Sequence, residues 1–167
     1  MRRMQVRPAV PDDALAVARI HVRAWQQGYR GLIPDGYLDA LRAEERAARY
    51  TFADPDPASP KTLVAGDNGG CGCVTTGPSP TTPEAGEILA IHVDPDHWRR
   101  GIGRVLIAAG RAALAARHHR DAVLWVLAGN ERAALFYASD GWFLDGREQE
   151  QNIWGITVHE LGYRRTL

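Results

Sequence analysis

One stretch of the chain, residues 87–127, constrains the fold more than any other. Residues 87–93 (EILAIHV) form an apolar run of strand length, and residues 101–118 then carry apolar side chains at helical spacing. Residues 123–127 (VLWVL) are a second apolar run, which is typical of a strand buried on both faces. A strand, a long helix and a buried strand in succession indicate a crossover unit, so we expect a mixed α/β sheet.

The residues on either side predict further elements. Pro11 and the two aspartates after it should begin a helix that ends near residue 28, with an aspartate as N-cap, and a second helix should span residues 35–50. Further strands are expected at 4–7, 61–66, 71–76, 142–149 and 153–163, with a helix at 130–138 and a loop at 53–60. No repeat or linker divides the chain, so we expect residues 1–167 to form one domain.

Charge and hydropathy exclude several classes of protein. The 20 lysines and arginines balance 20 aspartates and glutamates, which argues against binding to nucleic acid or to an anionic membrane. No apolar run approaches the roughly 18 residues of a membrane span, and the N-terminus lacks the apolar core of a signal peptide. Cys71 and Cys73 have no partner pair at zinc spacing, so we expect reduced thiols, no metal site and a cytoplasmic protein.

The start of the long helix has the features of an anion site. Residues 99–104 (RRGIGR) place glycines and arginines where the first turn of a helix leaves backbone N–H groups without partners. The segment lacks the lysine of a P-loop. A dinucleotide-binding fingerprint is also excluded, because Leu106 stands where its third glycine would be. The alternative is a tight helix start with exposed arginines.

The same stretch resembles the acyl-CoA-binding motif of the GNAT superfamily of N-acyltransferases, which is Gln/Arg-x-x-Gly-x-Gly/Ala after a strand. Gly101 and Gly103 match this pattern, whereas Trp98 departs from its first position. The family's second signature is an Asn, a Tyr about seven residues later, and then Gly-Phe/Trp. Asn130, Tyr137 and residues 141–142 match it.

The resemblance implies a GNAT fold: a mostly antiparallel sheet of about seven strands, four helices and a splayed strand pair that holds acetyl-CoA. The pyrophosphate would bind the amides of residues 99–104, and the pantetheine arm would pair with residues 91–93. A strand amide near His92 or Val93 would stabilise charge on the carbonyl oxygen. The cofactor-binding residues implied are Ile91, His92, Val93, Arg99, Arg100, Gly101, Ile102, Gly103, Arg104, Asn130 and Tyr137.

Two residues are candidates for proton transfer. The resemblance makes Tyr137 the general acid for the leaving thiolate, with core packing as the alternative. Glu87, fourteen residues before Gly101, is the candidate base, because burial would raise the pKa of its carboxyl toward neutrality. Strand alternation would place Glu87 on one face with residues 89, 91 and 93, and would point His92 the other way. The alternative for Glu87 is an edge position in solvent.

The sequence says less about the acceptor of the acetyl group than about the cofactor. Trp25 and Tyr29, one helical turn apart, are candidate substrate-binding residues, and a stripe of core residues is the alternative. Residues 31–60 hold six acidic residues against three arginines, a slight indication of a cationic acceptor. We expect an N-acetyltransferase that acts on a primary amine of a small molecule. Such a protein could form a homodimer. The alternatives are an acetyltransferase of protein N-termini or lysines, and a non-catalytic acyl-CoA-binding module.

Overall fold

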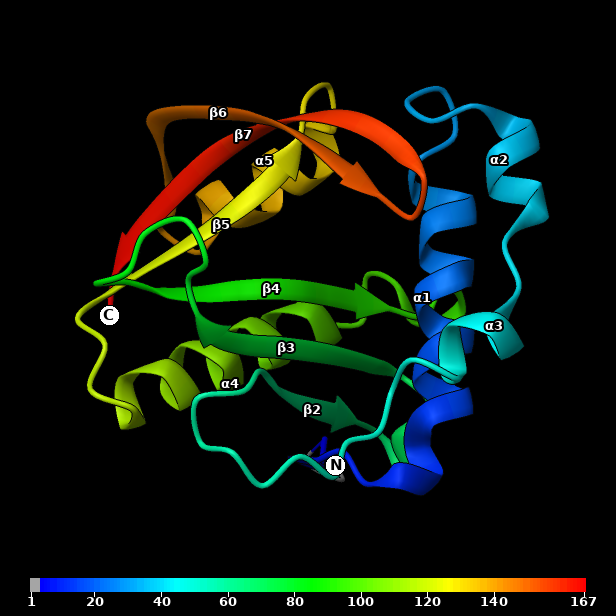
Figure 1. Ribbon diagram of the computed structural model, residues 1–167, viewed down its shortest axis with the longest axis horizontal. Helices are drawn as coiled ribbons and strands as arrows, with labels where there is room; N and C mark the ends of the chain where they lie inside the picture. The colour runs from blue at the N-terminus through cyan, green and yellow to red at the C-terminus, as the bar shows by residue number, and fades with distance from the viewer. Residues whose placement is uncertain (1–3) are drawn as a thin grey trace.

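Seven strands of residues 4–167, the part of the chain that the computed structural model describes, form one sheet in the order β1-β2-β3-β4-β5-β7-β6 (Figure 1). The strands are β1 (Val6–Pro8), β2 (Lys61–Ala65), β3 (Gly72–Pro78), β4 (Gly86–Val93), β5 (Asp121–Leu127), β6 (Phe143–Ile153) and β7 (Ile156–Thr166). The pair β4–β5 is parallel and the other neighbours are antiparallel. The predicted mostly antiparallel α/β sheet of seven strands is therefore confirmed.

The two central strands separate along their length. In the described chain, β4 and β5 pair only at Gly86–Ala122 and Glu87–Val123, and from there they diverge, as Figure 1 shows. Beyond Glu87, the edge of β4 that faces β5 carries backbone groups outside any ladder. This divergence is the splayed strand pair predicted from the sequence.

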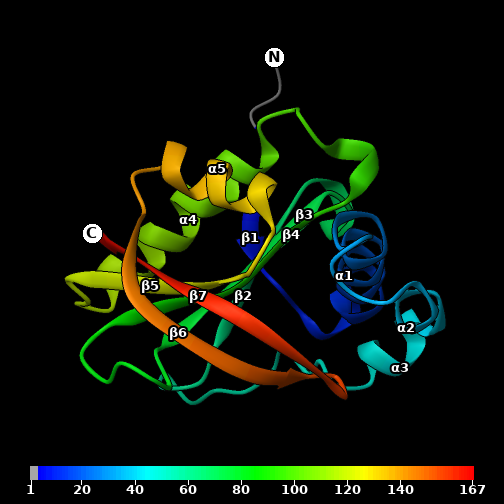
Figure 2. The same cartoon turned by 90° about the horizontal axis from the view of Figure 1, so that it is seen from above.

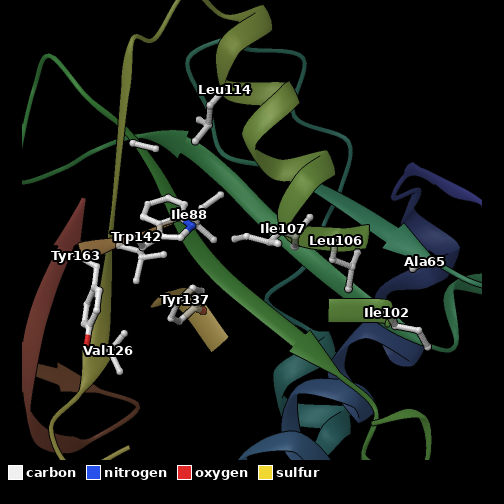
Figure 3. Packing of buried hydrophobic residues seen from close by; sticks show 13 residues of the cluster. Ala65, Ile88, Ile102, Leu106, Ile107, Leu114, Val126, Tyr137, Trp142 and Tyr163 are labelled. Atoms are coloured by element: carbon white, nitrogen blue, oxygen red, sulfur yellow. The ribbon is translucent and has the colours of Figure 1, made fainter. Parts of the chain in front are cut away.

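Five α-helices in the described chain cover the sheet: α1 (Ala14–Gly28), α2 (Asp35–Ala40), α3 (Ala43–Ala47), α4 (Ile102–Ala116) and α5 (Glu131–Ser139). Figure 2 shows α4 and α5 on one face and α1 to α3 on the other. The main core lies between the sheet and α4 and α5, where Leu106, Ile107 and Leu114 of α4 pack against Ile88 of β4 (Figure 3). Burial of these apolar side chains is the main force that holds the layers together.

Two local predictions are wrong. The single helix expected at 35–50 is two short helices, because Leu41 and Arg42 are extended and Arg42 donates hydrogen bonds to the carbonyls of Asp39 and Leu41. The chain thus has five α-helices rather than four in its described part. Asp13 does not cap α1 with its side chain; that carboxylate instead binds Arg7 and the backbone N–H of Val10.

A β-bulge changes which side chains share a face of β4. Thr76 pairs with Ile88 and Thr75 pairs with Ala90, so Leu89 is an extra residue in β4. Ile88, Ile91 and Val93 consequently pack in the core under α4 and α5. The predicted grouping of Glu87 with Ile91 and Val93 is wrong, because simple alternation assumes no extra residue.

The described residues lack both a membrane-spanning helix and a cluster of metal ligands. None of the helices in residues 4–167 is long and apolar enough to cross a membrane. The same residues contain no group of three or more His, Cys, Asp or Glu side chains that could hold a metal ion. Cys71 and Cys73 are both free thiols, and burial raises the pKa of Cys73 to about 12.

Candidate active site

The loop before α4 is shaped to present backbone amides. Arg99 and Gly101 both have left-handed backbone conformations, with φ of +60° and +79°, and Gly101 is the N-cap of α4. A side chain at Gly101 would be strained in this conformation. A Cβ atom at Gly103 would lie 3.2 Å from the ring of Phe136 in α5. Both motif glycines therefore keep the first turn of α4 free of side chains.

A cavity of about 470 Å³ lies between this loop, the end of β4 and α5. Seven of the predicted cofactor residues line it, together with Tyr137. His92, Arg100 and Asn130, also predicted to bind the cofactor, do not border it. The lining residues are Ile91, Val93, His97, Trp98, Arg99, Gly101, Ile102, Gly103, Arg104, Arg132, Ala133, Phe136 and Tyr137.

The rim of this cavity is basic. Arg99, Arg104 and Arg132 line it, and the sequence analysis missed Arg132. The Arg132 guanidinium carbon lies 3.8 Å from the ring centroid of Trp98, and the Trp98 indole N–H donates to the carbonyl of Val93 at 2.8 Å. Trp98, the residue that departs from the family motif, is therefore a fixed wall that positions an arginine.

Helix α5 places Tyr137 on the cavity wall. Asn130 is the N-cap of α5, and its side-chain oxygen accepts a hydrogen bond from the N–H of Ala133 at 3.2 Å. Tyr137, two turns later, is 9% exposed and belongs to the main core next to Trp142. Burial raises the pKa of the Tyr137 hydroxyl, so the group stays protonated at neutral pH. Tyr137 therefore both packs in the core and lines the cavity.

Glu87 is a buried carboxylate with an unsatisfied oxygen. The residue is 4% exposed, so the alternative of a solvent-exposed edge position is wrong. Its Oε1 atom is buried and has no hydrogen-bond partner. Burial raises the pKa of Glu87 to about 7, although the charge of Arg147 and hydrogen bonding from Trp125 oppose the rise. A proton acceptor near neutrality is the property that the sequence led us to expect.

The bulge brings His92 to the same side of β4 as Glu87. The His92 ring stacks on that of His21 from α1, with centroids 4.0 Å apart, on the face opposite the main core. Burial lowers the pKa of His92 to about 4 and that of His21 well below its usual value. Both imidazoles are neutral at pH 7, so His92 is a weak base despite its orientation.

The predicted acceptor residues belong to an aromatic cluster on this face. Trp25 is 5% exposed and stacks on Trp154 of the β6–β7 hairpin at 4.5 Å, with its indole N–H buried and unpartnered. Tyr29 makes an edge contact with Trp25 at 5.0 Å, and burial raises its pKa to about 12. Glu160 of β7, buried and missed by the sequence analysis, also contributes to that rise.

A second cavity, of about 790 Å³, opens beside this cluster. It lies between the α2–α3 region and the tip of the β6–β7 hairpin, and neither Trp25 nor Tyr29 borders it. Arg42, Arg46 and Arg49 line the cavity, and Glu45 is the one acidic residue among those that line it. The local charge is opposite in sign to the excess of acids counted along residues 31–60.

Comparisons with known structures support the fold. An N-acetyltransferase of Thermoplasma acidophilum solved with coenzyme A superimposes with a TM-score of 0.77 at 13% identity, over 99% of this chain and 100% of the other. A putative acetyltransferase of Salmonella typhimurium solved with acetyl-CoA superimposes with a TM-score of 0.71 at 18% identity, over 99% of this chain and 94% of the other. The cofactor predicted from the sequence is thus the one that these two structural neighbours hold.

Comparisons with known sequences identify the family. A probable N-acetyltransferase of Mycobacterium tuberculosis is 26% identical, over 96% of this chain and 92% of the relative. A mycothiol acetyltransferase of Acidimicrobium ferrooxidans is 33% identical over 90% of this chain, which spans about half of that relative (46%). The model of the acetyltransferase (GNAT) family matches residues 18–142. The chain therefore belongs to the GNAT family and is an acyl-CoA-dependent acetyltransferase, as its two motifs predicted.

Proposed function

We propose that this protein transfers an acetyl group from acetyl-CoA to a primary amine of a small molecule. One observation carries the proposal: β4 separates an arginine-rimmed cavity on one face from a buried Glu87 carboxylate with an unpartnered oxygen, Oε1, on the other. A donor and an acceptor could thus approach the splayed strand from opposite sides.

The cofactor cavity suits the chemistry of coenzyme A. The amides at the start of α4 and the rim arginines would hold the pyrophosphate, and the free edge of β4 would pair with the peptide-like pantetheine arm. Gly101 and Gly103 leave the space that a Cβ atom would fill. Bound acetyl-CoA supplies the activated acetyl thioester.

Glu87 would remove the proton of the amine. With a pKa of about 7, roughly half of these carboxylates are ionised at neutral pH, and each can accept a proton at Oε1 or Oε2. Glu160 is a second buried carboxylate whose pKa is raised by burial, but its carboxylate accepts a hydrogen bond from Gln149 at 3.0 Å. The unpartnered oxygen of Glu87 favours Glu87 as the base.

Tyr137 would donate the proton that the leaving sulfur requires. Its hydroxyl is protonated at neutral pH because burial raises its pKa, and its side chain lines the cofactor cavity. A backbone N–H of β4 near His92 or Val93 would stabilise the negative charge that develops on the carbonyl oxygen.

The aromatic cluster supports a small acceptor. Trp25, Tyr29 and Trp154 pack against one another, and Trp154 forms part of the wall of the second cavity, whose size of about 790 Å³ suits a small molecule. The mycothiol acetyltransferases among the relatives are also named for a small molecule. A structural neighbour from Brucella melitensis, a ribosomal-protein-alanine N-acetyltransferase, represents the alternative of a protein acceptor.

The test is an acceptor screen. Purified protein and acetyl-CoA are incubated with amino acids, amines, amino sugars and peptides, and release of free thiol is recorded. We expect turnover with at least one small amine and little with peptides. Turnover with peptides alone would favour the protein acceptor, and no thiol release with any amine would contradict the proposal. Glu160→Gln, compared with Glu87→Gln, separates the two candidate bases.

A further inference from the structure

The second cavity carries positive charge that the protein does not neutralise. Arg42, Arg46 and Arg49 line it, and within residues 4–167 none of the three forms an ion pair. Glu45 is the one acidic residue among those that line the cavity, and Asp35 and Asp39 both bind Arg30, so the lining keeps an excess of positive charge. Three arginines around one cavity make it a candidate site for an anion.

Arg46 is the most constrained of the three. Its guanidinium carbon lies 3.4 Å from the ring centroid of Trp154, and its Nε–H donates to the hydroxyl of Tyr50 at 3.3 Å. Desolvation lowers the pKa of Arg46, although the guanidinium remains protonated at neutral pH. A charged group that is partly removed from water and touches only neutral partners would be stabilised by a bound anion.

The position of Trp154 is unusual for its residue type. Trp154 and Gly155 form the turn of the β6–β7 hairpin, and both have positive φ, +52° and +86°. Such turns favour Asn-Gly, and a bulky aromatic residue is strained in this conformation. Stacking on Trp25 and a tilted contact with His21, with ring centroids 4.5 Å and 4.4 Å away, hold the Trp154 ring in the cavity wall. The strained residue therefore fixes the surface on which Arg46 lies.

The arginine-lined cavity lies on the same side of β4 as the candidate base. Trp154 borders the cavity and contacts His21, which in turn stacks on His92 at 4.0 Å. The positive charge of Arg46 also helps to lower the pKa of both histidines, which shows that it lies within electrostatic reach of β4. A molecule in this cavity would thus lie on the side of β4 that carries Glu87, with Trp154 and His21 between it and His92.

We propose that the acceptor is a primary amine that also carries a carboxylate or a phosphate, and that Arg46, held on Trp154, binds this anion. Arg42 and Arg49 add to the positive potential of the cavity. The planar guanidinium matches both anions, which share an edge of two oxygens. This inference rests on the proposed acetylation of a small amine and specifies the substrate class.

The test compares matched amines that differ in the anion. Amino acids are paired with their amides, and amino-sugar phosphates with the unphosphorylated amino sugars, and KM is measured by thiol release. We expect the anionic member of one series to have a KM lower by about tenfold or more. Arg46→Gln should remove this difference, and Arg46→Lys should restore part of it. Equal KM values within both series, or an Arg46→Gln effect of equal size on both members, would overturn the inference.

Calorimetry on coenzyme A-saturated protein gives a readout that does not need turnover. The anionic members should bind more tightly than their neutral partners, and Arg46→Gln should abolish the preference. Arg19→Gln, which removes an exposed arginine on the N-terminal half of α1, is the matched control and should bind like the wild type. If no amine releases thiol, the proposed function fails, whereas equal dissociation constants for both members overturn the anion site alone.

Discussion

Replacing Glu87 by glutamine should change both the stability and the pH–rate profile. The carboxyl has a pKa of about 7 in the folded protein against 4.5 in an exposed chain, because the fold holds it out of water. Between these values the folded state binds more protons than the unfolded state, so stability falls as pH rises. The raised pKa of Glu87 lowers the free energy of unfolding by about 3 kcal/mol at high pH, and about 2.5 kcal/mol of this loss occurs between pH 5 and pH 8.

Glutamine carries no charge, so this pH-dependent cost should be absent in Glu87→Gln. The free energy of unfolding is measured with urea at pH 5 and pH 8 for both proteins, and the variant's advantage should grow by about 2.5 kcal/mol between them. Any constant effect of the amide cancels in this comparison. Glu84→Gln, which changes an exposed carboxylate three residues away, should show no such growth.

The same variant tests the role of Glu87 as a base. Wild-type kcat/KM should fall as pH drops below about 7, and Glu87→Gln should lose this acidic limb and about 100-fold in rate. An unchanged profile would exclude Glu87 as the base. If the stability advantage were equal at the two pH values, the reasoning from burial to a raised pKa would be refuted.

Three further predictions concern the cofactor side and the bulge. Tyr137→Phe should lower kcat by about 100-fold and leave the KM for acetyl-CoA unchanged; a large loss of affinity with normal turnover would contradict the acid role. Acetyl-CoA at 100 times its Kd should raise Tm by about 5–10 °C and dephospho-CoA by less, whereas Gly103→Val, whose side chain would meet Phe136, should abolish the shift. No shift in the wild type at millimolar acetyl-CoA would refute the assigned site. Deleting Leu89 should remove the bulge but keep Glu87 and His92 on one face of β4, because the two residues are then four positions apart in a regular strand, so turnover and coenzyme A binding should both persist. Thiol release and calorimetry measure the two, and a loss of turnover as large as that in Glu87→Gln would contradict the register.

The cofactor side could be predicted from the sequence because its determinants are local. The glycines at 101 and 103, the strand before them and the helix after them are consecutive in the chain. The backbone conformation of Gly101 and the capping of α5 by Asn130 depend on the residue itself and its near neighbours. The cavity therefore forms where the two motifs predicted it, lined by eight of the eleven residues expected to bind the cofactor.

The acceptor side could not be predicted in the same way, because its determinants are distant in sequence. Arg46 and Trp154 are 108 positions apart and meet only when the β6–β7 hairpin reaches α3. The second cavity is positive because three arginines and only one acidic residue, Glu45, line it, while Asp35 and Asp39 pair with Arg30; a count of acids along the segment gave the opposite sign.

The sequence by itself determined the family, the seven-stranded sheet and the glycine-containing loop at the start of α4. Only the tertiary structure decided on which face of β4 the candidate base lies. The extra residue, Leu89, is accommodated by the pairing of β4 with β3, and no property of residues 87–93 alone shows it. A single unpaired residue reverses the alternation of side chains beyond it, because the strand repeats every two residues.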